Sequence, residues 1–158
     1  MRPRVSLAAG GRGVLDLPAL AALAVALAVA ACGGDGERAA ATPPAPAVPI
    51  DGALTVRAFE WGFEPQAIAL RRGEETRIVL DNDGSTLHNL QVDGIDVEIR
   101  ESQSTGPLSG DEGELFVGAE DGQEGRITLV PQEAGTFTFY CTIRGHRELG
   151  MEGTLTVE

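Results

Sequence analysis

Short runs in which apolar and polar residues alternate fill the chain from residue 51 to residue 158. The clearest run carries Leu54, Val56 and Ala58 on one face, and four others lie at 77–80, 126–129, 136–139 and 154–157. A period of two places successive side chains on opposite faces of a strand, and turn residues separate the runs. No stretch of this region has a convincing helical pattern of apolar residues. The sequence therefore predicts an all-β fold of antiparallel strands, arranged as a two-sheet sandwich or a small barrel.

One segment inside this region does not follow the alternation. Residues 101–124 are rich in glycine and contain seven acidic residues and no basic one. Only residues 115–117 have the composition of a strand. We expect a solvated loop between strands here, and a docking surface is the alternative.

The N-terminus has the organisation of an export signal. Arginines at positions 2, 4 and 12 precede an apolar run over 19–31. The run is shorter than the roughly 20 residues that span a bilayer, and it ends in small residues. Residues 29–32, Val-Ala-Ala-Cys, resemble a bacterial lipobox, in which the cysteine is acylated and becomes the first residue of the mature protein.

We therefore expect residues 1–31 to be a lipoprotein signal peptide. The protein would then be exported and held by a lipid on Cys32 to the extracytoplasmic face of the cell membrane. Ordinary cleavage near Ala31, which would leave Cys32 free, is the alternative. Residues 32–50 consist largely of alanine, proline and glycine, a composition that predicts a flexible, extended tether.

The net charge of the chain indicates which classes of binding partner are compatible with it. The chain has 24 acidic and 12 basic residues, a net charge of −12, and every basic residue is an arginine. Such a surface repels phosphate backbones, so we expect no nucleic acid as a partner. A basic protein guided by electrostatic steering is more compatible.

The chain has two cysteines. If Cys32 carries a lipid, Cys141 is the sole thiol of the mature protein and has no intrachain disulfide partner. An unpaired thiol is a liability in an oxidising compartment unless something occupies it, and a metal ion would do so.

The mature chain would contain two histidines, one free cysteine and one methionine: His88, Cys141, His146 and Met151. Taken singly, each has an ordinary explanation, such as a buried apolar cysteine or a methionine that fills a gap in the core. The last three follow one another as C-x₄-H-x₄-M beside the final strands. Two imidazoles and a thiolate with a weak axial thioether form an electron-transfer copper site.

Residues 139–155 resemble the copper loop of the plastocyanin and azurin family, the cupredoxins, and the four-and-four spacing is similar to that of sulfocyanin and rusticyanin. His88 followed by Asn89 matches the upstream ligand of the family, and residues 59–65 resemble its early strand. The resemblance implies a cupredoxin-like Greek-key β-sandwich over 51–158. It also implies one copper ion held by the four residues named above. Arg144 stands where related loops often have proline.

The resemblance also assigns roles around the ion. Asn89 is expected to hydrogen-bond toward Thr142, which follows the cysteine, and so to tie two ligand segments together; a simple turn residue is the alternative. His146 is expected to lie in an apolar surface patch as the electron port. A redox partner of the cytochrome or oxidase type would dock there, and Arg144 and Arg147 would influence the choice of partner.

These observations predict a monomeric one-electron carrier that is not an enzyme. Multicopper oxidases and copper nitrite reductases need further histidines, and the dinuclear centre of cytochrome oxidase needs two cysteines in its loop. A protein that delivers or stores copper is the main alternative. A zinc site of the Cys-His-His type is the third possibility, although Met151 would be a poor zinc ligand.

Overall fold

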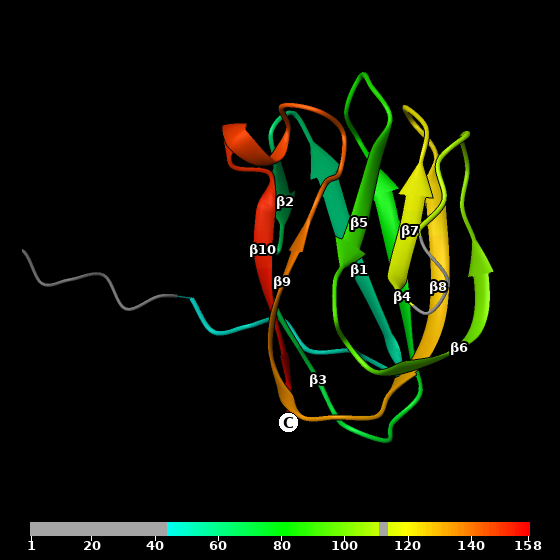
Figure 1. Cartoon of the computed structure of the whole chain (residues 1–158), viewed down its shortest axis with the longest axis vertical. Helices are drawn as coiled ribbons and strands as arrows, with labels where there is room; N and C mark the ends of the chain where they lie inside the picture. The colour runs from blue at the N-terminus through cyan, green and yellow to red at the C-terminus, as the bar shows by residue number, and fades with distance from the viewer. Residues whose placement is uncertain (1–43, 111–113) are drawn as a thin grey trace, which may run out of the picture. The chain divides into compact units, whose positions relative to one another are not determined.

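The computed structural model describes residues 44–110 and 114–158, which form two five-stranded sheets packed face to face (Figure 1). The strand order is β2-β1-β4-β8-β6 in the first sheet and β3-β10-β9-β5-β7 in the second. The strands are β1 Ala53–Phe59, β2 Gly62–Glu64, β3 Ala67–Leu70, β4 Thr76–Asn82, β5 His88–Val92, β6 Val97–Gln103, β7 Leu115–Ala119, β8 Glu124–Pro131, β9 Gly135–Tyr140 and β10 Glu152–Val157.

The predicted all-β sandwich is confirmed. In the described part of the chain the only helical element is a single 3₁₀ turn, η1, at Arg147–Leu149. No helix within 44–110 or 114–158 is long and apolar enough to cross a membrane.

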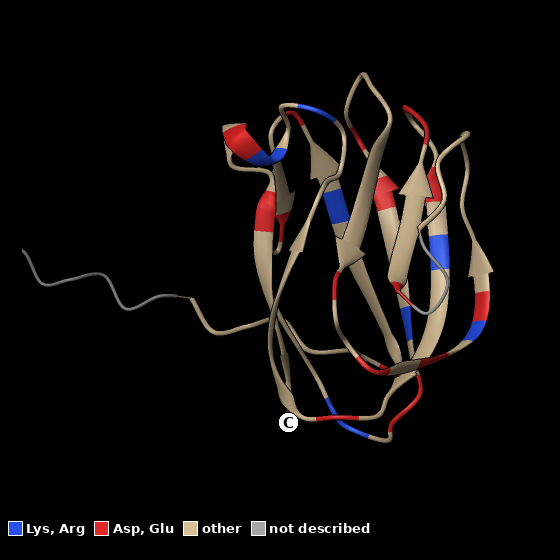
Figure 2. Cartoon of the chain, viewed as in Figure 1, with Lys and Arg blue, Asp and Glu red and all other residues tan. Residues whose placement is uncertain are grey.

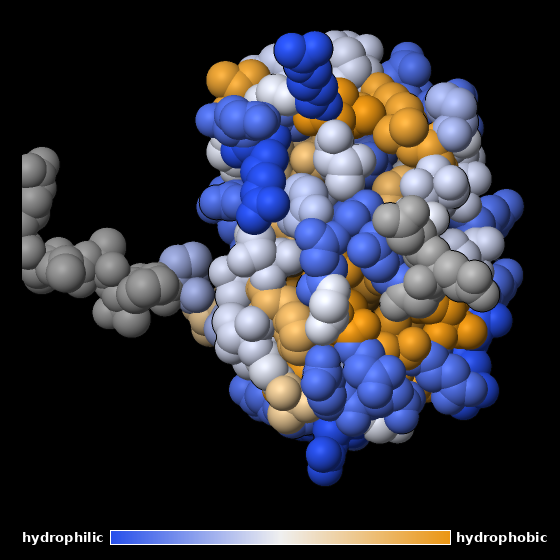
Figure 3. Space-filling model, viewed as in Figure 1, coloured by the Kyte–Doolittle hydropathy of each residue, from blue (hydrophilic) through white to orange (hydrophobic). Residues whose placement is uncertain are grey.

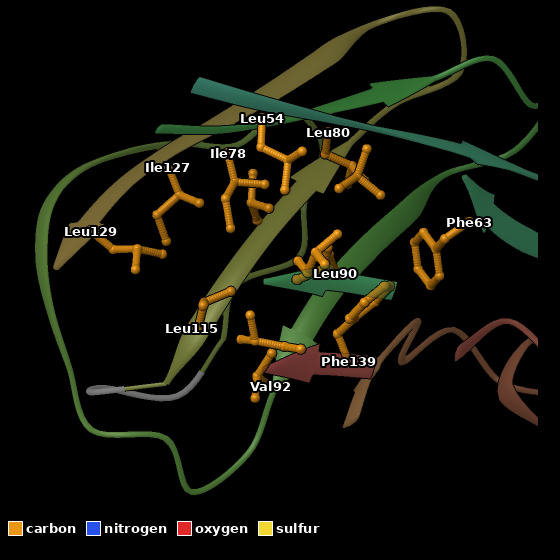
Figure 4. Close-up of a cluster of buried hydrophobic side chains, with 14 of the residues drawn as sticks. Leu54, Phe63, Ile78, Leu80, Leu90, Val92, Leu115, Ile127, Leu129 and Phe139 are labelled. Atoms are coloured by element: carbon orange, nitrogen blue, oxygen red, sulfur yellow. The ribbon is translucent and has the colours of Figure 1, made fainter. Parts of the chain in front are cut away.

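The apolar positions of the alternating runs form the core between the sheets (Figure 4). Leu54, Val56 and Ala58 of β1 are buried, while Thr55 between them is exposed. The second sheet contributes Leu90 of β5 and other apolar side chains from the facing strands. Because one face of each sheet is apolar, a shift of one residue in any of these strands would place its core residues in water.

The prediction that all the strands are antiparallel is wrong for two pairs. Strand β1 runs parallel to β4, and β3 runs parallel to β10, while the other pairs are antiparallel. These two pairs are parallel because of the way the chain connects the two sheets. After the β1–β2 hairpin the chain crosses to the second sheet in β3 and returns to the first in β4. Alternation along a strand fixes its buried face but not its neighbour, so it could not predict these pairings.

The segment 101–124, predicted as a loop, contains more strand than expected: its first three residues and its last residue belong to β6 and β8. Residues 101–103 belong to β6, whose backbone pairs with β8 despite its polar side chains. Because β6 is an edge strand, these side chains reach water, and Figure 2 shows charged residues along it. Strand β7 is two residues longer than the strand-like stretch 115–117 that the sequence indicated. All five residues of β7 are buried.

The described chain begins inside the predicted tether. The Ala47 N–H donates to the Ala67 carbonyl at 2.9 Å, and the Ala47 carbonyl accepts from the Ala69 N–H at 2.8 Å. Residues 44–50 therefore lie partly along the outer edge of β3. The predicted signal peptide, most of the tether and Cys32 lie outside the described residues, so those assignments stay predictions.

Candidate metal centre

Loops and strand ends at one end of the sandwich, the upper end in Figure 1, carry the four candidate ligands. His88 is the first residue of β5, and Cys141 directly follows β9. His146 precedes η1, and Met151 directly precedes β10. Strands β5, β9 and β10 are neighbours in the same sheet, so their ends converge although His88 is distant in sequence.

Three of these side chains form a compact, buried cluster. The Sγ atom of Cys141 lies 3.5 Å from Nδ1 of His146 and 4.0 Å from Nδ1 of His88. The three donor atoms all lie within 4.8 Å of one another. The exposed fraction is 0% for His88, 1% for Cys141 and 6% for His146. Both histidines therefore present the same ring nitrogen toward the sulfur.

Backbone hydrogen bonds bring Met151 to the same place. Its N–H donates to the His146 carbonyl at 3.0 Å, and its carbonyl accepts from the Cys141 N–H at 3.1 Å. Gly145 and Gly150 have φ angles of 88° and 101°, a left-handed conformation that glycine adopts without strain. The Met151 side chain is completely buried. The loop thus closes on itself and fixes its three candidate ligands.

Asn89 and Thr142 form a reciprocal pair of hydrogen bonds. The Asn89 Nδ2 donates to the Thr142 Oγ1 at 2.8 Å, and the Thr142 N–H donates to the Asn89 Oδ1 at 2.9 Å. Asn89 is completely buried. These bonds link the residue after His88 to the residue after Cys141, which is the arrangement that the resemblance implied. They hold two ligand segments at a fixed separation.

The ionisation of the cluster follows from its burial. Burial lowers the pKa of His88, with a further contribution from nearby His146, and burial also lowers the pKa of His146. Burial raises the pKa of the Cys141 thiol, while the backbone N–H groups of Asn89 and Ile143 oppose this by hydrogen-bonding to the sulfur. At neutral pH the metal-free cluster therefore has two neutral imidazoles and a protonated thiol. Binding of a metal ion by the Cys141 thiolate would release one proton.

We therefore expect copper affinity to rise about tenfold per pH unit between about pH 7 and 9, because binding releases the thiol proton and no histidine proton in this range. Competition titrations against a chelator at several pH values, corrected for the chelator's own titration, measure this slope. An affinity independent of pH would mean that the Cys141 sulfur does not bind the metal as a thiolate.

The β1–β2 hairpin borders the cluster, which the sequence did not predict. The Trp61 ring contacts His146 edge-on, with ring centroids 4.7 Å apart and an interplanar angle of 73°. Glu60 approaches His88 and accepts hydrogen bonds from Ser85. Hydrogen bonding by the Ser85 backbone N–H is the main cause that lowers the pKa of Glu60. The predicted early strand at 59–65 is therefore a hairpin whose tip covers the site.

Asn82 is the last residue of β4 and is completely buried, although the alternating run in the sequence covers only 77–80. Its Nδ2 donates to the carbonyls of Thr86 and Ala119 at 2.7 and 2.8 Å, and its Oδ1 accepts from the Gly84 N–H at 3.0 Å. Asn82 thus fixes the loop that leads to His88. The alternating run stops two residues before the end of the strand, and a single sequence cannot show that the Asn82 side chain bonds to the carbonyls of Thr86 and Ala119.

Replacing Asn82 by alanine would leave two carbonyls and one N–H without this partner. We expect a loss of about 2–4 kcal/mol in the free energy of unfolding, since each unsatisfied buried group costs about 1–3 kcal/mol. Urea denaturation of the metal-free protein measures it. Gln132→Ala, which removes one hydrogen bond from an exposed side chain, is the matched control. Equal stability of the two variants would contradict this role.

The donor set fits copper. Imidazole nitrogen suits Cu(II), and thiolate and thioether sulfur suit Cu(I). The sequence model for copper-binding proteins of the plastocyanin/azurin family matches residues 51–158. The chain belongs to this family. Its cofactor is copper, and the His-Cys-His-Met cluster is consistent with a single type 1 copper site, as the resemblance implied.

Two relatives of this cupredoxin are copper-resistant cuproproteins named CopI. The protein from Rubrivivax gelatinosus is 33% identical over 99 residues, which cover 60% of this chain and 59% of the relative. The present chain thus spans less than two thirds of that protein. The protein from Pseudomonas aeruginosa is 29% identical over 146 residues, which cover 73% of this chain and 81% of the relative.

Among solved structures, the cupredoxin is similar to reduced auracyanin from the photosynthetic bacterium Roseiflexus castenholzii. The TM-score is 0.54 at 16% identity, over 68% of this chain and 97% of auracyanin. At this identity the likeness concerns the fold, which agrees with the two-sheet sandwich described above.

Proposed function

We propose that this cupredoxin carries single electrons through one copper ion bound by His88, Cys141, His146 and Met151. The observation that supports the proposal best is the burial of two imidazole nitrogens and one thiol within 4.8 Å of one another. Copper bound there would alternate between Cu(I) and Cu(II) and so hold or release one electron. A carrier of this kind is not an enzyme.

The surrounding residues would keep the donor atoms in place during electron transfer. The Asn89–Thr142 bonds and the backbone bonds of the copper loop fix the ligand segments without using the metal. A site held by its own framework has little to rearrange when its charge changes. Burial also excludes water and other ligands from the cluster.

We propose that electrons enter and leave through His146. The rest of the cluster is more deeply buried. The Trp61 ring contacts the His146 ring, and Ile143 and Leu149 form hydrogen bonds with the His146 backbone. Trp61 is 42% exposed and Leu149 59% exposed, while Ile143 is half-buried. Apolar atoms reach the surface at this end of the molecule in Figure 3. A redox protein that buries this patch would come within a short distance of the copper ligands.

Stopped-flow mixing of the Cu(II) protein with a reduced, basic cytochrome tests the proposal. We expect a second-order rate constant of at least about 10⁵ M⁻¹s⁻¹, typical of protein association. Leu149→Ser, which removes apolar surface from the patch without adding a charge, should slow the reaction. Val48→Ser, which makes the same kind of change at an equally exposed residue beside the C-terminal end of β10, should not. Equal slowing by both variants would contradict docking at His146, and absence of electron exchange would contradict the carrier function.

Copper delivery or storage is the second candidate function, and the names of the CopI relatives favour it. The two functions differ in what the site does with the ion. A carrier keeps copper in both oxidation states and shows intense visible absorption toward the red end of the spectrum. A handling protein would give up Cu(I) to a competing chelator and be colourless. Spectra recorded during such a competition distinguish them.

We also propose that the protein is exported and anchored by a lipid on Cys32, which lies outside the described residues. The support is the sequence of residues 29–32 after an apolar run. Mass spectrometry of the N-terminal peptide from the membrane fraction would detect the acylated cysteine. An unmodified Cys32, or a mature chain that begins elsewhere, would contradict the anchor.

A further inference from the structure

The second ring nitrogen of His88 lies in an unusual environment. Its Nδ1 faces the Cys141 sulfur, whereas its Nε2 is buried and has no hydrogen-bond partner among the residues that the structure describes. A histidine that binds a metal through one nitrogen generally donates the N–H of the other to a carboxylate or a carbonyl. The surroundings of Nε2 should therefore contain an acceptor that completes the site.

The nearest charged group is the carboxylate of Glu60, at the tip of the β1–β2 hairpin. Its Oε1 lies 3.9 Å from the Nε2 of His88. The same oxygen accepts hydrogen bonds from Ser85, from the backbone N–H at 2.5 Å and from Oγ at 3.0 Å. A movement of about 1 Å would bring it within hydrogen-bond distance of Nε2. The Glu60 side chain is 31% exposed, so it has room to make this movement.

Gly84 keeps the space between these two groups open. A Cβ atom at this position would lie 2.7 Å from the His88 Nε2 and 2.9 Å from the Glu60 Oε1. Gly84 does not have a positive φ angle, so steric access and not backbone conformation accounts for glycine here. The loop that leads to His88 thus leaves a direct approach from the carboxylate to the imidazole.

We propose that Glu60 is a positioning residue of the copper centre, whose carboxylate accepts the Nε2–H of His88. It would fix the tautomer in which the Nδ1 lone pair faces the Cys141 sulfur. Its negative charge makes the imidazole a stronger donor and favours Cu(II) over Cu(I), so it lowers the reduction potential. The part of this inference that concerns the potential rests on the proposed function; the part that concerns the tautomer does not.

Glu60→Gln removes the charge and retains the shape. We expect it to shift the Cu(II)/Cu(I) equilibrium about threefold to tenfold toward Cu(I), a rise of roughly 30–60 mV for a one-electron couple. Ser85→Ala, which removes one of the bonds that orient Glu60, should shift it less in the same direction. The control Glu64→Gln makes the same charge change on the same hairpin, where the carboxylate pairs with Arg57, and should leave the potential unchanged.

Two readouts separate the inference from the proposed function. The potential is measured by spectroelectrochemistry of the full chain, and the His88 tautomer by ¹⁵N NMR of the metal-free protein. We expect the Nε2–H tautomer of His88 to dominate in the wild type. The ratio of the Nε2–H to the Nδ1–H tautomer should fall at least threefold in Glu60→Ala. An unchanged tautomer in that variant, or a blue Glu60→Gln protein with the wild-type potential, would overturn the role of Glu60. A wild-type protein without a type 1 spectrum would overturn the proposed function instead.

Discussion

Replacing Cys141 by serine is expected to abolish the intense visible absorption of the copper-loaded protein. That absorption needs a thiolate bound to copper, and Cys141 is the only cysteine in the cluster. Serine is close in size to cysteine, and the site is 1% exposed, so the packing of the sandwich should survive the change. Copper binding should also weaken strongly, because the hydroxyl is a much poorer ligand for Cu(I) than the thiolate.

Visible spectra of the wild type and of Cys141→Ser after addition of one equivalent of copper measure this effect. Circular dichroism of both proteins without metal shows whether the fold is retained. Cys32→Ser is the matched control, because it removes the other cysteine of the chain, which lies outside the predicted site, and should leave the colour unchanged. Colour that persists in a folded Cys141→Ser protein would refute the assignment of the thiolate.

Replacing Met151 by leucine is expected to leave copper bound and to raise the reduction potential. Leucine fills a volume close to that of methionine, and such exchanges in a core usually cost less than about 1.5 kcal/mol. Met151 is completely buried. Its hydrogen bonds to Cys141 and His146 come from the main chain, so the substitution should keep them. Loss of the weak axial thioether removes a donor that tunes the potential of such sites.

We expect the Cu(II)/Cu(I) equilibrium to shift at least tenfold toward Cu(I), which raises the potential by about 59 mV for a one-electron couple. Spectroelectrochemistry measures this shift. Leu149→Met is the control, since it adds a thioether on the exposed side of the same loop and should leave the potential as it is. If the Met151→Leu protein loses copper altogether, the methionine is a principal ligand and not a weak axial one. If its potential falls, Met151 is not a ligand.

The sequence predicted the parts of the molecule that local pattern determines. Alternation identified strands such as β1 because one face of each has to be buried. The copper loop was recognisable because the positions of Cys141, His146 and Met151 follow from one short segment. The two observed sheets confirm the predicted fold, and the match to the copper-binding family confirms the predicted cofactor. The assignment of the four ligands and the transfer of electrons stay predictions.

Contacts between distant segments account for what the sequence did not predict. Nothing near Glu60 or Trp61 in the sequence indicates that the hairpin tip reaches His88 and His146. Similarly, β6 contains polar residues because an edge strand needs only backbone pairing on one side, so its composition resembles that of a loop. Such features depend on the order of strands in the sheets, which a single sequence does not specify.

X-ray absorption spectroscopy at the copper edge of the loaded full-length protein tests the central claim most directly. We predict one copper ion per chain, with one short copper–sulfur bond, two copper–nitrogen bonds from imidazole and at most a weak contact to a second sulfur. A first coordination shell of nitrogen and oxygen alone, or more than one copper ion per chain, would contradict a mononuclear centre built on Cys141, His88 and His146.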